Sequence, residues 1–308
     1  MMGMARSASV AAMMVLMSGC AAVVPPPEER AGVASPQRVQ TAPPTPSPVA
    51  TPVVPVDRDF HYQGKFIQGG LVIGEAPTGT QSLTFDGKPI PVADDGKFLI
   101  AFDRDHDDQA VLVATLADGQ SVRDTLPVAK RAWRIERLNR LPRVSQPSAE
   151  FKARRPGELD QIHAARAMDT GSQGWRQKFI WPVTGRISGL FGSQRFYQGQ
   201  PGAYHSGTDI AVPTGTPVVA PADGVVTLAV SDPFTLEGKL VFIDHGMGLN
   251  SVFIHLSQVD VHQGEHVKQG QKIAETGATG RATGPHLHWG LKWNDARIDP
   301  MLVAGPMP

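Results

Sequence analysis

The 308-residue sequence has one cysteine, few aromatic residues (6%) and no excess of either charge. A single cysteine excludes an internal disulfide and a zinc site built from several thiolates. The 29 basic and 29 acidic side chains give a formal net charge of zero. This balance argues against a protein that holds nucleic acid or anionic lipid by bulk charge. Any metal must therefore be bound through nitrogen and oxygen.

Glycine and proline are abundant, with 32 and 27 residues. Both exceed their usual frequencies of roughly 7% and 5%. This composition favours turn-rich β structure with a linker and disfavours a helical bundle. The length suggests about two domains.

Residues 1–20 have the features of an export signal. Arg6 precedes an apolar run over 8–17, which is too short to span a bilayer permanently. The only cysteine, Cys20, stands at the expected cleavage point and is similar to the lipid-modified cysteine of bacterial lipoproteins. The resemblance implies a lipid anchor through Cys20 and, with Ala21 next, a periplasmic lipoprotein at the outer membrane of a Gram-negative bacterium. An ordinary secretory signal and a retained anchor are the alternatives.

Two segments of different character follow the signal. Residues 21–56 contain ten prolines and almost no aromatic residues, which predicts a disordered tether. Residues 57–133 hold short apolar runs separated by Asp-Gly pairs, which favour hairpin turns. They predict a small β-sandwich-like domain. Its acidic cluster is interpreted as a solvated loop, because it lacks the glycine and glutamate of a calcium loop; it comprises Asp103, Asp105, Asp107 and Asp108.

Residues 134–178 are expected to form a helical connector. Pro156-Gly157 interrupts the chain, and apolar residues then recur at helical spacing. These residues are Leu159, Ile162, Ala165 and Met168. His163 lies in this helix, and nothing marks it as a ligand.

Residues 179–304 return to a β pattern and carry most of the histidines. The seven are His205, His245, His255, His262, His266, His286 and His288. The spacing of His286 and His288 would place both imidazoles on one face of a strand. His205 and Asp209 can meet one ion only if the chain turns between them, which Gly207 would allow.

Two imidazoles and one carboxylate form a zinc site with an open fourth position, as in catalytic zinc centres. Zinc lowers the pKa of a bound water to roughly 7 and polarises a carbonyl. The sequence has no H-E-x-x-H motif to supply a glutamate base. His255 and His286 are therefore the candidate proton acceptors. His245, His262 and His266 are expected to be structural or at the surface.

Three blocks of this segment resemble the lysostaphin/LytM family of zinc peptidoglycan endopeptidases. They are H-S-G-T-D at 205–209, F-I-H-L-S at 253–257 and G-A-T-G-R-A-T-G-P-H-L-H at 277–288. The likeness covers roughly 180–300. The preceding β domain also resembles that of Gram-negative members.

The resemblance implies a mainly β fold, with an antiparallel β-sheet LytM-like peptidase domain preceded by the small β domain and the connector. It implies one Zn²⁺ per chain, bound by His205, Asp209 and His288, with His255 and His286 as the catalytic pair. Metal-bound water would attack the scissile carbonyl. The implied substrate is peptidoglycan, at D-alanyl–diaminopimelyl cross-links. Phe253 stands where many members carry tyrosine, so a hydroxyl that could stabilise the oxyanion is absent there, at a cost of about 10²–10³ in rate.

Two other classes of function are alternatives. A non-enzymatic LytM-like domain could activate amidases or act as a scaffold at the division site, although such domains are recognised by lost zinc ligands. A lipoyl- or biotin-type carrier would need a modified hairpin lysine, which is missing. A regulatory cell-envelope protein is left open as a partner, and nucleic acid is not expected. The β domain could be a spacer, a wall-binding module or a lid over the groove.

Overall fold

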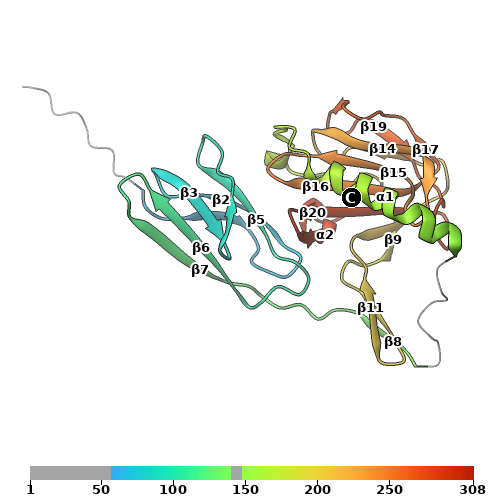
Figure 1. Cartoon of the computed structure of the whole chain (residues 1–308), viewed down its shortest axis with the longest axis horizontal. Helices are drawn as coiled ribbons and strands as arrows, with labels where there is room; N and C mark the ends of the chain where they lie inside the picture. Colours follow the sequence, from blue (N-terminus) through green and yellow to red (C-terminus); the bar gives the residue numbers. More distant parts are fainter. Residues whose placement is uncertain (1–56, 140–147) are drawn as a thin grey trace, which may run out of the picture. The chain divides into compact units, whose positions relative to one another are not determined.

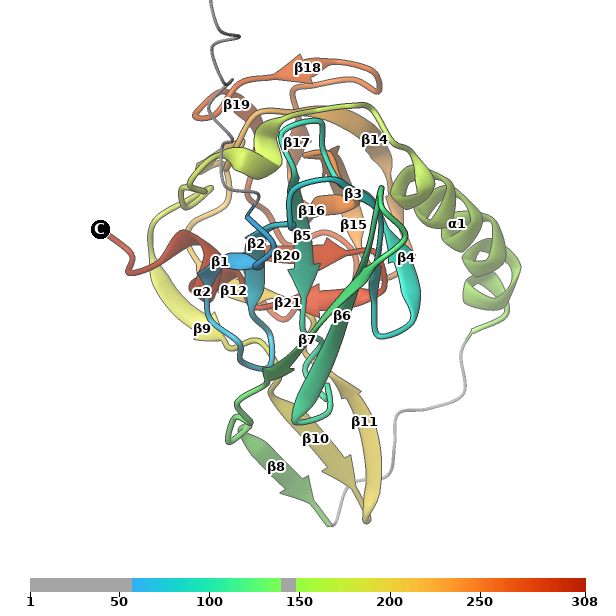
Figure 2. The same cartoon turned by 90° about the vertical axis from the view of Figure 1, so that its left-hand side faces the viewer.

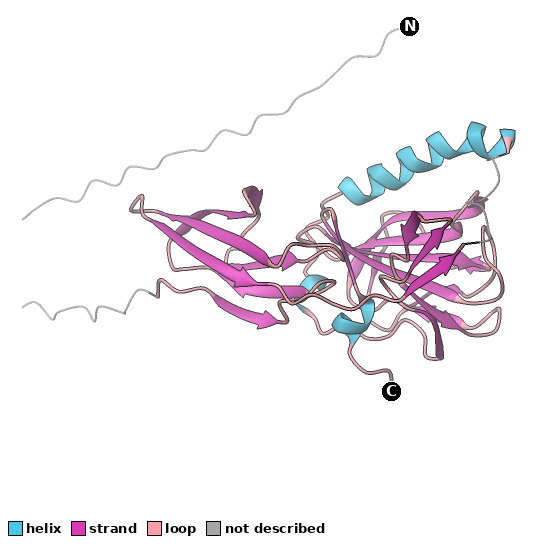
Figure 3. Ribbon diagram, turned by 90° about the horizontal axis from the view of Figure 1, so that it is seen from below, coloured by secondary structure: helices cyan, strands magenta, loops and turns pink. Residues whose placement is uncertain are grey.

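Strands are the main regular secondary structure in the computed structural model, which describes residues 57–139 and 148–308. The predicted mainly β fold is confirmed (Figure 1; Figure 3). The expected signal, Cys20 and the tether lie outside the described residues, so those expectations stay predictions. No helix within the described ranges is long and apolar enough to cross a membrane.

The N-terminal strands form two antiparallel sheets, ordered β1-β2-β5 and β4-β3-β6-β7. Their bounds are β1 His61–Gly64, β2 Leu71–Glu75, β3 Thr80–Phe85, β4 Lys88–Ile90, β5 Lys97–Ala101, β6 Gln109–Leu116 and β7 Ser121–Pro127. Every second residue of β6 is buried, because one face of an antiparallel strand packs on the core. Asp86 and Gly87 both have positive φ, as a type I′ hairpin turn requires.

The acidic cluster departs in part from the solvated loop that the sequence predicts. Three of its carboxylates are exposed, but Asp103 is half-buried. Asp103 accepts hydrogen bonds from the Tyr204 hydroxyl at 2.9 Å and from the Arg297 backbone N–H at 2.9 Å. Its neighbour Arg104 is buried and donates to the Gly192 carbonyl at 2.8 Å. This part of the loop therefore contacts residues of the C-terminal region, Gly192, Tyr204 and Arg297.

The connector helix α1 runs over Ala149–Ala167 and includes Pro156, so the expected break at Pro156-Gly157 is wrong. Ser148 caps the helix by accepting a hydrogen bond from the Phe151 N–H at 3.0 Å. A proline inside a helix removes one backbone hydrogen bond. The helix continues through it because packing and ion pairs on both sides of Pro156 fix α1 to the sheet.

The apolar spacing of α1 predicts its buried face in part. Ile162 and Ala165 are buried against β14 (Gly224–Phe234) and β15 (Gly238–Asp244), in a cluster with Phe234 and Phe242. Met168, the residue after the last turn, is 40% exposed. A short 3₁₀ helix, Gly174–Arg176, then leads into the C-terminal region.

The C-terminal region is built on one sheet, ordered β18-β14-β15-β16-β20-β12-β9, with β21 paired to β20. The bounds are β9 Arg186–Gly189, β12 Thr208–Ala211, β14 Gly224–Phe234, β15 Gly238–Asp244, β16 Leu249–Leu256, β18 His266–Val267, β20 Leu287–Trp293 and β21 Ala296–Ile298. Helix α2, Pro300–Ala304, follows. Within the sheet, β20 lies between β16 and β12, and this order brings the three conspicuous sequence blocks together.

Two three-stranded sheets flank this large sheet. One, ordered β13-β19-β17, comprises Pro217–Val219, Lys272–Glu275 and Gln258–Val259. The other, ordered β11-β10-β8, comprises Gln200–Tyr204, Gln194–Tyr197 and Ile135–Leu138 (Figure 2). Strand β8 pairs in parallel with β10, so the predicted connector contributes a strand as well as a helix.

His245, at the end of β15, is fully buried. Its Nδ1 lies 2.8 Å from the Asp223 carbonyl oxygen and its Nε2 lies 2.8 Å from the Ser251 hydroxyl. Burial lowers its pKa to about 4. In the unfolded chain a histidine has a pKa near 6.5. Between about pH 6.5 and pH 4 the unfolded state therefore binds a proton at His245 that the folded state does not bind. The free energy of unfolding therefore falls as the pH drops through this window.

We expect His245 to account for a loss of about 2 kcal/mol of stability between pH 7 and pH 5. Urea unfolding of the wild type and of His245→Gln at both pH values measures this difference. The variant should lose less stability than the wild type over the same interval, whatever its stability at pH 7. Equal losses would show that another group causes the acid sensitivity.

Candidate active site

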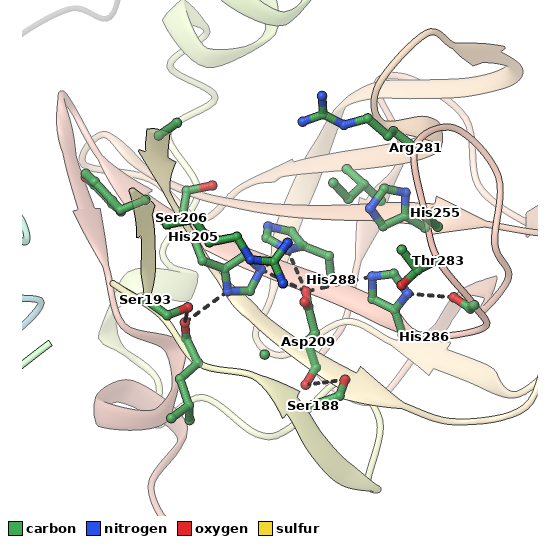
Figure 4. Close-up of a pocket in the computed structure, with 18 of the residues that line it drawn as sticks. Ser188, Ser193, His205, Ser206, Asp209, His255, Arg281, Thr283, His286 and His288 are labelled. Carbon is green, nitrogen blue, oxygen red and sulfur yellow. Dashed lines mark hydrogen bonds and ion pairs between the residues drawn. The ribbon is translucent and has the colours of Figure 1, made fainter. Parts of the chain in front are cut away.

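Three side chains, two from neighbouring strands and one from the segment before β12, lie close together in a groove (Figure 4). Asp209 on β12 is paired with His288 on β20. His205 lies between β11 and β12, and a bend at Gly207 separates it from Asp209. The structure therefore brings together the three residues that the sequence motifs single out as metal ligands. In the part of the chain that the structure describes, they form the group whose geometry suits a metal ion.

The ligand atoms of these residues face one another at short range. His205 Nε2 lies 3.0 Å from both Asp209 Oδ1 and His288 Nδ1, and His288 Nδ1 lies 2.8 Å from Asp209 Oδ1. His205 Nδ1 lies 3.0 Å from the Leu190 carbonyl oxygen, which can only accept a hydrogen bond. A neutral His205 that donates there carries a lone pair on Nε2, facing a carboxylate oxygen. Two acceptors at this distance need a proton or a metal cation between them, and this set of ligand atoms suits zinc.

The electrostatics of the three groups support the same conclusion. Burial would raise the pKa of Asp209, but its hydrogen bonds with His205 and His288 lower that pKa well below the ordinary range. Burial lowers the pKa of His288. For His205 burial also opposes protonation, and the hydrogen bond with Asp209 outweighs it and raises the pKa. The site therefore stabilises a carboxylate and draws a positive charge toward it.

Two glycines make room for this arrangement. The chain bends at Gly207, as expected, although Gly207 does not have a positive φ. A side chain there would bring its Cβ to 2.7 Å from His288 Nε2. A Cβ at Gly189, on β9, would overlap the Asp209 carboxylate. Both positions need glycine because the ligand side chains pack directly on the backbone.

His255 and His286 lie beside the three ligand residues, with ring centroids 4.8 Å apart. His255 Nδ1 lies 2.9 Å from the Thr279 carbonyl oxygen, and His286 Nδ1 lies 2.8 Å from the Gly284 carbonyl oxygen. Each ring donates its Nδ1 proton to a carbonyl and so keeps Nε2 for other partners. His286 Nε2 is 3.8 Å from Asp209 Oδ1. Both side chains line the groove.

Burial, helped by the nearby His286 and His288, lowers the pKa of His255 to about 4. His255 is therefore a neutral imidazole at pH 7 and can accept a proton. Its backbone has φ 65°, a left-handed conformation that is uncommon outside glycine.

Phe253 does not bear on the groove in the way the sequence suggests. Its ring is fully buried in the core, whereas the next residue along β16, Ile254, lines the groove. Successive residues of a strand point to opposite faces. A hydroxyl on the residue at 253 would therefore lie in the core, and the expected loss of an oxyanion donor is wrong.

The groove also contains arginines that sequence reasoning missed. Arg134, Arg186 and Arg281 line it, and within the described ranges none has a carboxylate partner within 4.0 Å. Its two glutamates are paired, Glu136 with Arg195 and Glu237 with Arg155. Figure 4 shows Arg281 on the same side of the site as His255. Arg134 and Arg186 lie outside the three conspicuous sequence blocks, whereas Arg281 lies inside the block at 277–288.

The remaining histidines lie outside the groove. His262 and His266 are exposed, as expected of surface residues, and His163 is exposed on α1. His245 is buried and hydrogen-bonded, as expected of a structural residue.

Comparison with known sequences matches the part of the chain that carries this site to a protein family. The model of peptidase family M23 matches residues 203–300. Peptidoglycan DD-endopeptidase ShyA of Vibrio cholerae is 42% identical over 105 residues, which cover 34% of this chain and 24% of ShyA. DD-carboxypeptidase/endopeptidase Mpg of Neisseria gonorrhoeae is 40% identical over 123 residues, which cover 40% of this chain and 28% of Mpg. The aligned part of the chain thus spans about a quarter of the length of these relatives.

Comparison with solved structures reaches further along the chain. A crystal structure from Pseudomonas aeruginosa that bears the name peptidase M23 is similar with a TM-score of 0.60 and 31% identity. The match covers 78% of this chain and 96% of that one. It therefore includes residues well outside 203–300.

Proposed function

The chain belongs to peptidase family M23, and from this premise we propose that it is a zinc-dependent endopeptidase that hydrolyses the peptide cross-links of peptidoglycan, at D-alanyl–diaminopimelyl bonds. The observation that carries the proposal is the convergence of His205 Nε2, Asp209 Oδ1 and His288 Nδ1 beside two further histidines. The names of ShyA and Mpg agree with this reaction.

His205, Asp209 and His288 would hold one zinc ion and leave one position open to the groove. When bound, zinc lowers the pKa of a coordinated water to roughly 7 and polarises a carbonyl. Asp209 supplies the negative charge that balances the cation. The hydrogen bond from His205 Nδ1 to the Leu190 carbonyl fixes the tautomer that leaves Nε2 available.

The two other histidines divide the proton transfers. His255 is neutral and partly accessible from the groove, so its Nε2 accepts the proton that hydrolysis releases. The imidazolium formed can return this proton to the leaving amine. His286 donates its Nδ1 proton to the Gly284 carbonyl, and in its protonated, imidazolium form it can also donate a hydrogen bond from Nε2 to the developing oxyanion.

The charge of the groove supports a substrate with free carboxylates. Arg134, Arg186 and Arg281 surround the site without acidic partners among the described residues. Guanidinium groups bind carboxylates through paired hydrogen bonds. The stem peptides of peptidoglycan that contain diaminopimelate carry such carboxylates, and a neutral pentaglycine bridge does not.

The test is the conversion of cross-linked muropeptide dimers to monomers by the mature protein. We expect conversion with one equivalent of zinc, loss of conversion after chelation, and recovery when zinc is returned. A protein that binds stoichiometric zinc without cleaving dimers would contradict an active endopeptidase and leave a latent enzyme or an activator of amidases as the alternatives.

The export route is a second part of the proposal. We propose that Cys20, which lies outside the described residues, is lipidated and anchors the protein at the periplasmic face of the outer membrane. Metabolic labelling with a fatty acid should mark the wild type and leave Cys20→Ser unlabelled. Labelling of both proteins would contradict the proposal that the lipid is attached at Cys20.

A further inference from the structure

The backbone of His255 is held in an unusual conformation by two hydrogen bonds. Its φ of 65° lies in the left-handed region, and its side chain is buried. Such a conformation in a non-glycine residue persists only where the surroundings determine it. The His255 N–H donates to the Glu237 carbonyl at 2.8 Å, and the ring Nδ1–H donates to the Thr279 carbonyl at 2.9 Å. The direction of Nε2 thus depends on where these two carbonyls lie.

The Glu237 carbonyl belongs to the 235–238 turn and the Thr279 carbonyl to the 279–281 loop, and hydrogen bonds connect these two segments. The Lys239 N–H donates to Thr279 Oγ1 at 2.9 Å, and the Arg281 N–H donates to the Leu236 carbonyl at 2.9 Å. Gly238 has a positive φ, and a Cβ there would overlap Thr279. A shift of the turn would therefore move both supports of His255 at once.

Helix α1 fixes this turn from outside. Arg155 donates two hydrogen bonds to the Glu237 carboxylate, at 2.6 and 2.8 Å, and a third to Glu158 at 3.2 Å. Glu158 in turn accepts from the Thr235 N–H at 2.8 Å and from the Thr235 hydroxyl at 2.6 Å. The Glu158 side chain is only 5% exposed, and those of Arg155 and Glu237 are 15% and 17% exposed. Paired charges with this little exposure and this geometry fix the position of the elements that carry them.

We propose that Arg155 is a positioning residue for His255: through its paired hydrogen bonds with Glu237, helix α1 holds the 235–238 turn and so directs His255 Nε2 into the groove. Helix α1 lies outside residues 203–300, the part that matches the family model. The proposal rests on the proposed function for its kinetic readout, since it concerns the proton acceptor of that reaction.

The chain offers a matched control on the same helix. Arg154 also contacts the end of β14, where it donates to the Pro233 carbonyl at 2.7 Å, but it does not reach Glu237. Loss of either arginine weakens the attachment of α1 to this hairpin. Only loss of Arg155 frees the Glu237 carboxylate.

The test compares Arg155→Gln, Arg154→Gln, Glu237→Gln and the double variant Arg155→Gln/Glu237→Gln in the zinc-loaded mature protein. We expect Arg155→Gln to lower kcat about tenfold, with KM and bound zinc unchanged, because misplacement of a reacting group costs rate rather than binding. Glu237→Gln should lose a similar factor, and the double variant no more than either single variant. Arg155→Lys should recover part of the rate.

A loss of kcat in Arg155→Gln no larger than in Arg154→Gln, or losses that multiply in the double variant, would overturn the proposal. The NMR signals of the histidine rings give a readout without catalysis. In Arg155→Gln the His255 ring signals should shift or broaden, while those of His245 stay in place. A wild type that cleaves no dimers would refute the proposed function alone, and unchanged His255 signals would refute the positioning role.

Discussion

Asp209→Asn should abolish zinc binding and reduce dimer cleavage by roughly a thousandfold or more, since a bound metal contributes several kcal/mol to transition-state stabilisation. Asparagine keeps the shape of the side chain and removes its charge. Asp209 Oδ1 lies within 3.0 Å of both His205 Nε2 and His288 Nδ1, so its charge faces both imidazoles. In the Asp209→Asn variant the zinc ion would have only two neutral imidazoles as protein ligands, and no negative charge would balance its own charge.

Zinc content after dialysis and the rate of cleavage check this prediction together. Asp295→Asn is the matched control, because Asp295 is 91% exposed and does not line the groove. It should bind one zinc ion and retain the wild-type rate. An Asp209→Asn protein that holds zinc as tightly as the control would show that the ion binds elsewhere.

His255→Asn should separate catalysis from metal binding. Asparagine tolerates the left-handed backbone conformation better than alanine does, so this change removes the imidazole with little added strain. We expect one equivalent of zinc, a nearly unchanged KM, and a kcat lower by about 10²–10⁴, the usual contribution of a general base.

The comparison for this variant is His262→Asn, which alters an exposed histidine outside the groove. That protein should cleave dimers at the wild-type rate. If His255→Asn kept more than about a tenth of the activity, the proton acceptor would have to be another group, and His286 would be the next candidate.

The sequence allowed prediction of the parts of the site that depend on short spacings. His286 and His288 line one groove because alternate residues of an extended segment share a face, and the motif at 205–209 brings His205 and Asp209 together. Phe253 was misjudged because its motif does not reveal which face of β16 is buried. The hairpin turn at Asp86-Gly87, in contrast, could be predicted, because it depends only on the local conformational preference of an Asp-Gly pair.

The parts that could not be predicted depend on contacts between distant residues. Arg155 and Glu237 are 82 residues apart, and Asp103 and Tyr204 are 101 apart. Nothing in the sequence near Arg155 indicates a partner on the β14–β15 turn. Pro156 was interpreted as a break because the rule for proline describes an isolated helix, whereas α1 is fixed by tertiary contacts on both sides of the proline.

The central place of β20 in the large sheet has a consequence for the order of folding. During synthesis β12, β14, β15 and β16 all leave the ribosome before β20, which must then insert between β16 and β12. Asp209 and His288 are 79 residues apart, and contacts of such separation form slowly. An incomplete chain that lacks β20 also lacks His288 and cannot assemble the three ligands. We therefore expect cleavage activity only after β20 has been inserted into the sheet. The time course of zinc binding during refolding would measure when this insertion occurs.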